Sequence, residues 1–269
     1  MGFTDVNVNR DAFVNVLWVE SDLIGSSWGK NRRRHHEQGG DFKMKRSERI
    51  VIIGVGETAS LAYEYFTYDS PYSIVAFAVD AEYKKMDRFR DVPVIALEEL
   101  TRRYPVGDVK IFVAMGSGQL NYQRAKMFCR IKGAGYSCVS YVSSRAFVWR
   151  DVKIGENCFV MENNVLQPFT EIGNNVVLWS GNHVGHQSKI GDNCFLTSHV
   201  VISGFCNIRH NTFMGVNSCV ADHVSVGADN FIAMGTCLSK STEDNEIYRG
   251  NPAVRMRISA RTFCGVGGL

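Results

Sequence analysis

A six-residue apolar period is the feature of this sequence that most constrains its fold. Every sixth residue from Val142 to Leu238 is aliphatic or methionine, at seventeen successive positions. Such residues make up roughly 30% of an ordinary chain, so the probability that a run of this length arises by chance is well below about one in a million. Neither the helix period nor the strand period of two explains this spacing. The C-terminal half therefore predicts a repeat architecture.

Groups of three hexads form a larger repeat. Every third apolar position opens a similar tetrad rich in Gly, Asn or Asp, namely at Ile154, Ile172, Ile190, Ile208 and Val226. A unit of eighteen residues predicts one coil of a triangular prism, with a short strand on each face, a turn at each corner and the apolar residue pointing to the axis. Gly, Asn and Asp suit such corners because they tolerate unusual backbone angles. The register never slips, so we expect no long loop to leave the coils.

The cysteines favour a structural role. The chain has eight and none of them form a CxxC pair. Cys158, Cys194 and Cys206 share one position of the repeat with Ser and Thr residues. Small residues at a repeated position predict buried packing, so we expect neither a redox role nor a metal site.

The residues before the repeat alternate between strand and helix patterns, which predicts a small parallel α/β sheet. The expected strands are 50–54, 73–79, 109–115 and 137–142, and the expected helices are 57–66, 97–103 and 119–131. The predicted organisation is an extension of unassigned role, an α/β domain, a β-helix and a short tail, at 1–46, 47–141, 142–257 and 258–269. Met44 is an alternative start that the sequence leaves open.

Composition points to a small-molecule substrate. The net charge is +3, and basic and acidic residues are interleaved outside Arg32, Arg33 and Arg34, so no footprint for nucleic acid is evident. The longest apolar stretches have the length of strands, far below the roughly 20 residues of a membrane helix. No secretory signal is apparent in the first 45 residues. We therefore expect a cytoplasmic protein without a membrane span.

Three turns of the α/β half are predicted to meet at one edge of its sheet. A glycine turn follows the first strand and opens a helix, as a phosphate-binding turn does. An acid ends the second strand, where it can reach a ribose or a base, and a further turn ends a later strand at the same carboxyl edge. These turns predict a nucleotide-sugar site made of Gly54, Gly56, Glu57, Asp80, Gly116 and Ser117. Ordinary structural glycines remain the alternative explanation.

Three motifs carry a resemblance to a known family. They are Trp179-Ser-Gly-Asn-His-Val-Gly-His, Thr197-Ser-His-Val-Val-Ile-Ser-Gly and Gly250-Asn-Pro-Ala. With them, residues 48–257 resemble the sialic acid O-acetyltransferases and bacillosamine-pathway amino-sugar N-acetyltransferases. The resemblance implies a Rossmann-like domain, a left-handed parallel β-helix and a homotrimer that binds acetyl-CoA between neighbouring helices. It also implies acetyl transfer to a nucleotide-linked sugar for bacterial surface glycan synthesis.

The resemblance identifies His186 as the general base, since three residues separate it from the Ile190-Gly191 pair. Direct transfer requires a group that takes a proton from the attacking amine or hydroxyl, and imidazole suits this task near neutral pH. The family often places an acid after this histidine. Here Gln187 can orient the ring but cannot stabilise imidazolium by charge. The absence of an acid at this position slightly favours an amine acceptor over a hydroxyl. Gly204, one coil above, is expected to leave a void for a ligand and to donate its N–H to the oxyanion.

The remaining site residues also follow from the resemblance. Substrate contacts are expected at Asn182 and His183. Acetyl-CoA contacts are expected at Phe195, His199, Gly204, Gly215, Val216, Gly235 and Pro252. Ordinary prism turns are the alternative explanation for the glycines and for Pro252.

Three other functions compete with this interpretation. A nicotinamide-dependent oxidoreductase would leave the β-helix without a role. A zinc hydratase built on the same prism would need histidines stacked a whole number of coils apart, and none of the histidines from His183 to His223 are so related. A non-enzymatic trimeric scaffold that binds a nucleotide sugar remains the alternative. The sequence leaves open the sugar, the nucleotide and the acyl group.

Overall fold

The computed structural model describes residues 48–266. The chain divides into two units, Met1–Lys43 and Met44–Leu269, and all described residues belong to the second. The extension predicted at 1–46, the alternative start Met44 and the last three residues of the tail lie outside the described residues. No helix of the described part is long and apolar enough to cross a membrane.

The first part of the described chain is a five-stranded sheet with helices packed on it. The strand order is β3-β4-β2-β1-β5, and all neighbours are parallel except β3 and β4. The strands are β1 (Glu48–Ile53), β2 (Tyr72–Val79), β3 (Arg88–Phe89), β4 (Val92–Ala96) and β5 (Lys110–Val113). The helices are α2 (Glu57–Tyr68), α3 (Leu100–Arg103) and α4 (Tyr122–Gly133), with short 3₁₀ turns at Ala81–Tyr83 and Leu97–Glu99.

Two expectations for this part need correction. The helix expected from residue 119 begins three residues later, because Gln119, Leu120 and Asn121 adopt left-handed backbone angles with φ of 50°, 50° and 70°. The strand expected at 137–142 does not join the α/β sheet as a strand. Its last two residues form β6 (Tyr141–Val142), which pairs with a strand of the repeat region.

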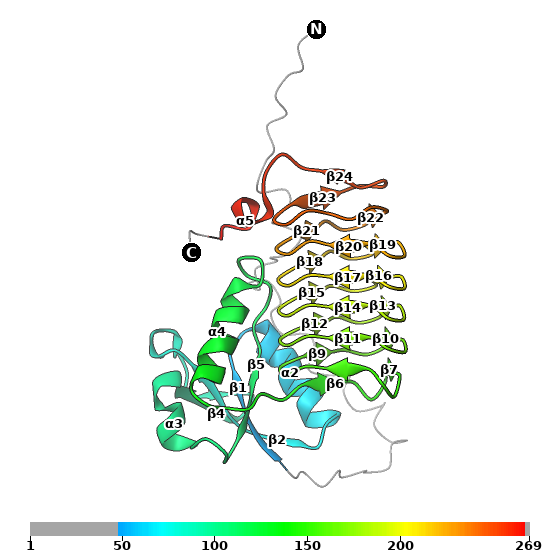
Figure 1. The fold of residues 1–269 in the computed structure, drawn as a ribbon. Coiled ribbons are helices and arrows are strands. Elements are labelled where there is room, and N and C mark those ends of the chain that lie inside the picture. Colours follow the sequence, from blue (N-terminus) through cyan, green and yellow to red (C-terminus); the bar gives the residue numbers. More distant parts are fainter. Residues whose placement is uncertain (1–47, 267–269) are drawn as a thin grey trace, which may run out of the picture. The chain divides into compact units, whose positions relative to one another are not determined.

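The repeat region is a three-sided prism of stacked parallel strands (Figure 1). We name its sides by what they present outward. The covered sheet contains β6 (Tyr141–Val142), β9 (Phe159–Val160), β12 (Val177–Leu178), β15 (Phe195–Leu196), β18 (Phe213–Met214), β21 (Phe231–Ile232), β23 (Ile247–Arg249) and β24 (Val254–Arg255). The apolar sheet contains β7 (Phe147–Val148), β10 (Val165–Leu166), β13 (His183–Val184), β16 (Val201–Ile202), β19 (Cys219–Val220) and β22 (Cys237–Leu238). The polar sheet contains β8 (Lys153–Ile154), β11 (Glu171–Ile172), β14 (Lys189–Ile190), β17 (Asn207–Ile208) and β20 (Ser225–Val226).

The six-residue period marks the interior of this prism, as predicted. From Val160 to Leu238 every residue of the period is at most 3% exposed. Strands eighteen residues apart pair in register, for example Val165 with His183. These repeats and stacked parallel sheets fit the left-handed β-helix that the resemblance implies.

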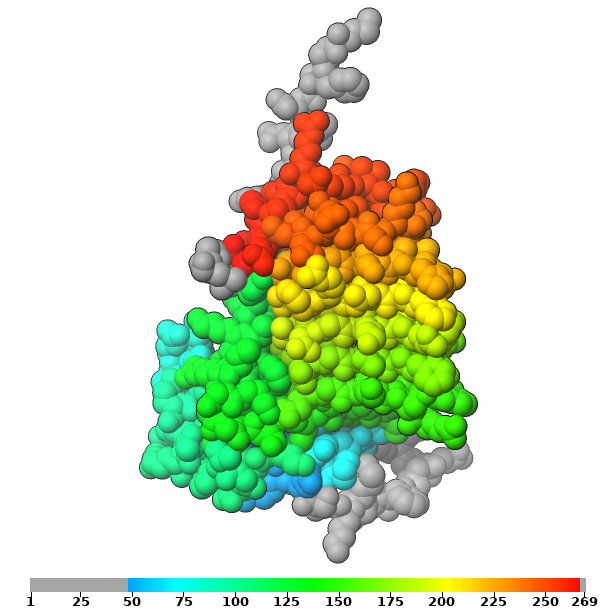
Figure 2. Space-filling view, viewed as in Figure 1, coloured from blue at the N-terminus to red at the C-terminus, as the bar shows by residue number. Residues whose placement is uncertain are grey.

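The outward residues differ from side to side. Those of the covered sheet are mostly aromatic and form one core with the α/β part, whose green surface lies directly against the coils in Figure 2. Those of the polar sheet include Lys153, Glu171 and Lys189, which form ion pairs. Those of the apolar sheet include Phe147 and Val201, which are 53% and 42% exposed. One apolar side of the prism is therefore uncovered in the described chain.

The three corners follow the same naming. The distal corner joins the apolar sheet to the polar sheet and lies opposite the covered sheet. The proximal corner joins the covered sheet to the apolar sheet. The asparagine corner joins the polar sheet to the covered sheet, and its left-handed position is always Asn or Asp, at Asn157, Asn175, Asn193, Asn211, Asp229 and Asn245.

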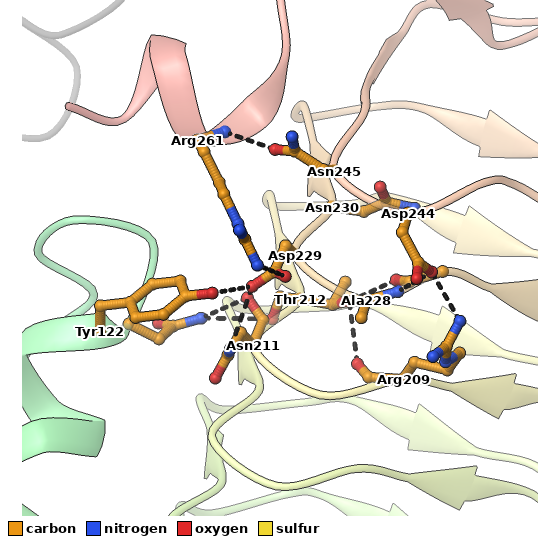
Figure 3. A network of polar contacts seen from close by, with 12 residues as sticks. Tyr122, Arg209, Asn211, Thr212, Ala228, Asp229, Asn230, Asp244, Asn245 and Arg261 are labelled. Carbon is orange, nitrogen blue, oxygen red and sulfur yellow. Dashed lines mark hydrogen bonds and ion pairs between the residues drawn. The ribbon is translucent and has the colours of Figure 1, made fainter. Parts of the chain in front are cut away.

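The C-terminal tail clamps the α/β part to the asparagine corner (Figure 3). Asp229 accepts hydrogen bonds from the Tyr122 hydroxyl at the start of α4 (2.8 Å) and from the Arg261 guanidinium (2.5 Å). Arg261 lies in the short helix α5 (Ala260–Phe263), and its backbone N–H donates to Asn245. Although the sequence assigned no role to the tail, its described residues therefore join α4 to the last coils.

Candidate functional site

His186 lies at the distal corner, in the turn between β13 and β14. Its side chain is exposed. Because this corner is opposite the covered sheet, His186 lies on the side of the prism that faces away from its own α/β part. One chain therefore does not bring its own glycine turns to its own His186.

The imidazole of His186 is positioned by packing. A β carbon built on Gly204 would lie 2.6 Å from the ring Cε1 and 3.1 Å from each ring nitrogen. The ring also packs edge to face on Phe205, with the centroids 5.0 Å apart, and Phe205 in turn stacks on His223 at 4.7 Å. The void expected above His186 is thus filled by the imidazole itself and not left for a ligand.

Gln187 does not orient the ring. It occupies the left-handed position of the corner with φ of 56°, and its backbone N–H donates to Pro168. Among the described residues, neither its side chain nor the imidazole of His186 forms a hydrogen bond. The neighbouring coil instead supplies Gln167, whose side-chain oxygen accepts the backbone N–H of His186 at 2.9 Å. The predicted hydrogen bond from Gln187 is therefore absent in the described chain.

Two expectations at the site need correction on hydrogen-bonding grounds. The N–H of Gly204 donates to the Asp222 carboxylate at 2.7 Å, so it is not free to meet an oxyanion. Asn182 is fully buried, and its amide donates to Trp179 O and accepts from Val200 N–H. These bonds use Asn182 to stack the coils, which leaves no polar atom exposed for a substrate.

His183 and His199 lie at different places on the apolar sheet. His183 points outward from its middle and is half-buried between Val165 and Val201. His199 is exposed at the proximal corner, with φ of 59°. A β carbon on Gly181 would lie 2.6 Å from the Nδ1 of His199, so this ring too rests on a glycine of the neighbouring coil.

The residues expected to bind acetyl-CoA do not converge within one chain. Val216 and Gly235 are exposed at the proximal corner with His199, and Pro252 is exposed after a cis bond near the last coil. Gly215 is buried. A β carbon there would lie 2.5 Å from the backbone nitrogen of Met234, so the position has no space for a side chain. Gly204 lies at the distal corner instead. The two corners border the same apolar sheet.

The expectation for Phe195 is wrong. Its ring points outward from the covered sheet, is 7% exposed and stacks on Phe213 in the core shared with the α/β part. The sequence contains the signal that excludes it, since the same position of neighbouring coils holds Phe159, Val177, Phe213 and Phe231. A continuous apolar column of this kind indicates a side covered by another layer.

The turns after β1 and β5 lie side by side at the carboxyl edge of the α/β sheet. The two strands pair, and Gly116 approaches the Thr58 hydroxyl, 3.8 Å from its β-carbon position. Gly54 has φ of 118° and packs against Ala114 O, so a side chain there would clash. Gly56 and Glu57 are exposed at the start of α2, where the first N–H groups have no helical acceptor. Ser117 follows Gly116 in the second turn.

Asp80 is also at this edge, but it already has a partner. Its carboxylate forms an ion pair with Arg130, which lies 4.0 Å from Glu98 as well. A ribose or base would therefore have to compete with Arg130 for this acid.

Sequence reasoning did not single out Arg124. This residue of α4 is 1% exposed, and burial lowers the pKa of its guanidinium to about 10. Its donors reach Gly116 O at 2.9 Å and Asn193 O at 2.8 Å, so it connects the turn after β5 to the asparagine corner. An arginine in an amphipathic helix carries no sequence signal of this burial.

Three cysteines are packed inside the prism, as predicted. Cys158, Cys194 and Cys206 are at most 1% exposed, and all eight cysteines are free thiols. Burial raises the pKa of Cys158 to about 11 and that of Cys194 to about 12. Within residues 48–266, no group of three or more His, Cys, Asp or Glu side chains is arranged to hold a metal ion.

The stacked coils and their corner motifs make the repeat region a hexapeptide-repeat prism. The sequence model described as bacterial transferase hexapeptide (six repeats) matches residues 151–184 and 169–204. This match confirms the predicted resemblance to hexapeptide-repeat transferases. No curated protein sequence matches the chain significantly.

Several solved structures are similar to this fold over 77% to 78% of the chain. Perosamine N-acetyltransferase PerB from Caulobacter crescentus, in complex with CoA and GDP-perosamine, is 25% identical with a TM-score of 0.69, over 77% of this chain and 96% of that chain. The acetyltransferase domain of PglB from Neisseria gonorrhoeae, in complex with acetyl-CoA, is 19% identical with a TM-score of 0.55, over 78% of this chain and 100% of that chain. WeeI from Acinetobacter baumannii is 18% identical with a TM-score of 0.50, over 78% and 100% of the two chains.

Proposed function

We propose that this protein is an acetyl-CoA-dependent N-acetyltransferase that acts on a nucleotide-linked amino sugar, with His186 as the general base. One observation carries the proposal: the His186 imidazole is exposed at the distal corner, forms no hydrogen bond within the described chain and packs against Gly204. The prism that bears this corner matches an N-acetyltransferase solved with CoA and a nucleotide amino sugar. A variant of that enzyme with one histidine replaced by asparagine has also been solved with the same two ligands.

The chemistry at this corner needs no enzyme nucleophile. The amine of the sugar attacks the thioester carbonyl, and His186 accepts the proton that the nitrogen loses. The tetrahedral intermediate then collapses, the C–S bond breaks, and the CoA thiolate leaves and takes up a proton. An amine acceptor suits a base without an acidic partner, because it needs less help to lose its proton than a hydroxyl does.

The proposal requires two copies of the chain at each active site. His186 and Gly204 lie at the distal corner, whereas the glycine turns and the proximal corner lie toward the covered sheet. A homotrimer with the apolar sheets between its subunits would place the distal corner of one subunit beside the proximal corner of the next. It would also cover the exposed side chains of Phe147 and Val201. Acetyl-CoA would then lie between His186 of one subunit and His199, Val216 and Gly235 of the next.

We assign acceptor binding to the α/β part. Its strand order β4-β2-β1-β5 is that of half a Rossmann fold, which supports the Rossmann-like domain proposed for residues 47–141. Gly54, Gly56, Glu57, Gly116 and Ser117 lie together at the edge where such sheets bind ligands. A cytoplasmic role in surface glycan synthesis remains part of this proposal.

Release of free thiol from acetyl-CoA tests the proposed function. The acceptors are nucleotide-linked amino sugars and their hydroxyl counterparts, and the wild type is compared with His186→Ala. We expect acceptor-dependent release with the amino sugars, reduced at least about 100-fold in the variant. Unchanged release in the variant would refute His186 as the base, and no release with any acceptor would refute the acetyltransferase.

A further inference from the structure

A buried cation without a counter-ion joins the two halves of the described chain. Arg124 is 1% exposed, and no described carboxylate lies within ion-pair distance of its guanidinium. Its partners are all neutral, and the Phe195 ring packs against it with the centroid at 5.4 Å. A buried guanidinium without a carboxylate carries a desolvation cost that neutral acceptors offset only in part. The described chain therefore leaves this buried positive charge without a negative partner.

The bonds of Arg124 end at two places. One group consists of carbonyl oxygens of the asparagine corner, at Asn175 (3.2 Å), Asn193 (2.8 Å) and Cys194 (3.3 Å). The other consists of Gly116 O (2.9 Å) and Asn121 Oδ1 (3.3 Å), at the two ends of the turn that follows β5. Arg124 thus holds this turn against the prism.

The turn held by Arg124 presents unpaired donors. Gln119, Leu120 and Asn121 have left-handed φ angles, and the turn closes through Asn121 N–H to Ser117 O. In the described chain, no hydrogen bond uses the backbone N–H groups of Ser117, Gly118 or Gln119. Gly116 lies beside Thr58 in the first turn of α2, whose N–H groups are also without helical acceptors. Two sets of free N–H donors therefore meet at one edge of the sheet.

We propose that Arg124 is a positioning residue for the diphosphate of the acceptor, acting through the peptide that joins Gly116 to Ser117. The guanidinium donates to Gly116 O and so polarises this peptide, which makes the Ser117 N–H a stronger donor to a phosphate oxygen. The diphosphate in turn supplies the negative charge that the buried cation lacks. This inference rests on the proposed function, because it takes the acceptor to be a nucleoside diphosphate sugar.

The same bonds set the height, along the prism axis, of the turn after β5, which we call the acceptor turn. Asn175 and Asn193 belong to adjacent coils, and the turn of His186 lies between them in the sequence. A three-fold axis parallel to the prism leaves this level unchanged from one subunit to the next. Arg124 therefore keeps the acceptor turn within about one 4.8 Å strand spacing of the level of the partner's His186.

Calorimetric binding of pyrophosphate, uridine diphosphate and guanosine diphosphate tests the inference on the full chain. We expect Arg124→Met to weaken the binding of these three probes at least about 10-fold while the affinity for acetyl-CoA stays within about 2-fold. Arg124→Lys keeps the charge but not the fork of donors, so it should recover part of the loss. Arg102→Met removes an exposed cation of α3 that pairs with Glu99 and makes no contact with Arg124, and this variant should bind as the wild type does.

Ser117→Pro provides a second route if Arg124→Met does not fold. It removes one N–H that has no partner within the described chain, so folding should survive while diphosphate binding weakens. Wild-type affinity for the probes in a folded Arg124→Met, or in Ser117→Pro, would overturn the inference and leave the acetyltransferase standing. Absence of binding by the wild type to every probe would overturn the diphosphate acceptor itself, and the inference with it.

Discussion

The imidazole of His186 occupies the space in which any residue other than glycine at position 204 would carry its side chain. The distance from a β carbon at that position to the ring Cε1 would be 2.6 Å. Because the ring makes no side-chain hydrogen bond in the described chain, contact with Gly204 and Phe205 is what determines its orientation. Gly204, which the sequence pattern assigned to a ligand, therefore leaves its space to the His186 ring.

The first prediction concerns this contact. Gly204→Ala should displace the imidazole by about 1 Å and lower kcat about 100-fold, since misplacement of that size is costly in an active site. The double variant His186→Ala/Gly204→Ala should be no slower than His186→Ala alone, because both changes act on one ring. Steady-state thiol release measures all three variants. Additive losses in the double variant would show that Gly204 acts independently of His186.

The second prediction concerns the uncovered apolar sheet. Val201→Asp places a carboxylate in the middle of this side and should convert a trimer into monomers, because an unpaired charge cannot be buried between subunits without a large cost. Asn207→Asp adds the same charge one strand further along the same coil, on the polar sheet, and should remain trimeric. Light scattering gives the mass of each variant. A monomeric wild type, or a trimeric Val201→Asp, would contradict this assignment of the interface.

The third prediction concerns the tail clamp at Asp229. Burial by itself would raise the pKa of this carboxyl, but hydrogen bonds from Asn211, Tyr122 and Arg261 outweigh burial and lower it. The ionised form is thus favoured by folding, so its contribution is present above the ordinary carboxyl pKa and is lost as the pH falls through the lowered value. Asp229→Ala should destabilise the fold by about 2 to 4 kcal/mol at pH 7, since it leaves three donors, of which the Asn211 amide is buried, without this acceptor.

Denaturant unfolding at pH 7 and pH 3 tests the clamp. The difference in unfolding free energy between the wild type and Asp229→Ala should shrink at the lower pH. Arg261→Ala should cost about 1 kcal/mol or less, because 42% of its side chain is exposed and solvent screens the ion pair. A difference that stays constant with pH would show that Asp229 contributes as a neutral group.

The sequence predicted the prism better than it predicted the site. A period of six repeated over many coils leaves one solution for the inward residues, so Leu166, Val184 and Ile202 were placed correctly without any structural information. The outward positions carry a weaker signal, because the same period applies to covered and uncovered sides. Phe195 was misassigned for this reason, although the aromatic column to which it belongs is visible in the sequence.

Hydrogen bonding between coils was beyond sequence reasoning. The bond from Gly204 N–H to Asp222 and the burial of the Asn182 amide depend on side-chain rotamers one coil away. The late start of α4 has a similar origin. Leu120 has an apolar side chain that suits a helix, yet tertiary contacts of Asn121 and Arg124 with the prism accompany a left-handed turn there.

The fourth prediction concerns thiol reactivity. Cys129 is exposed on α4, whereas burial raises the pKa values of Cys158 and Cys194 to about 11 and about 12. Since the thiolate is the reactive form, iodoacetamide at pH 8 should label Cys129 first and leave the two buried thiols unmodified until the chain unfolds. Peptide mass spectrometry reads the order of labelling. Early modification of Cys158 or Cys194 would contradict their packing in the interior of the prism.

Subunit complementation tests the central claim, that two copies of the chain build each active site. His186→Ala removes the base and keeps the acceptor turn. Gly56→Tyr blocks the turn after β1, which lies beside the acceptor turn, and keeps the base. It should fold because no atom outside the neighbouring residues lies within 4 Å of a β carbon there. Each variant alone should be inactive, and trimers refolded from an equal mixture should recover about a quarter of wild-type thiol release, since a quarter of their sites combine an intact base with an intact turn. A mixture as inactive as its parents would place both parts of the site in one chain and contradict the account.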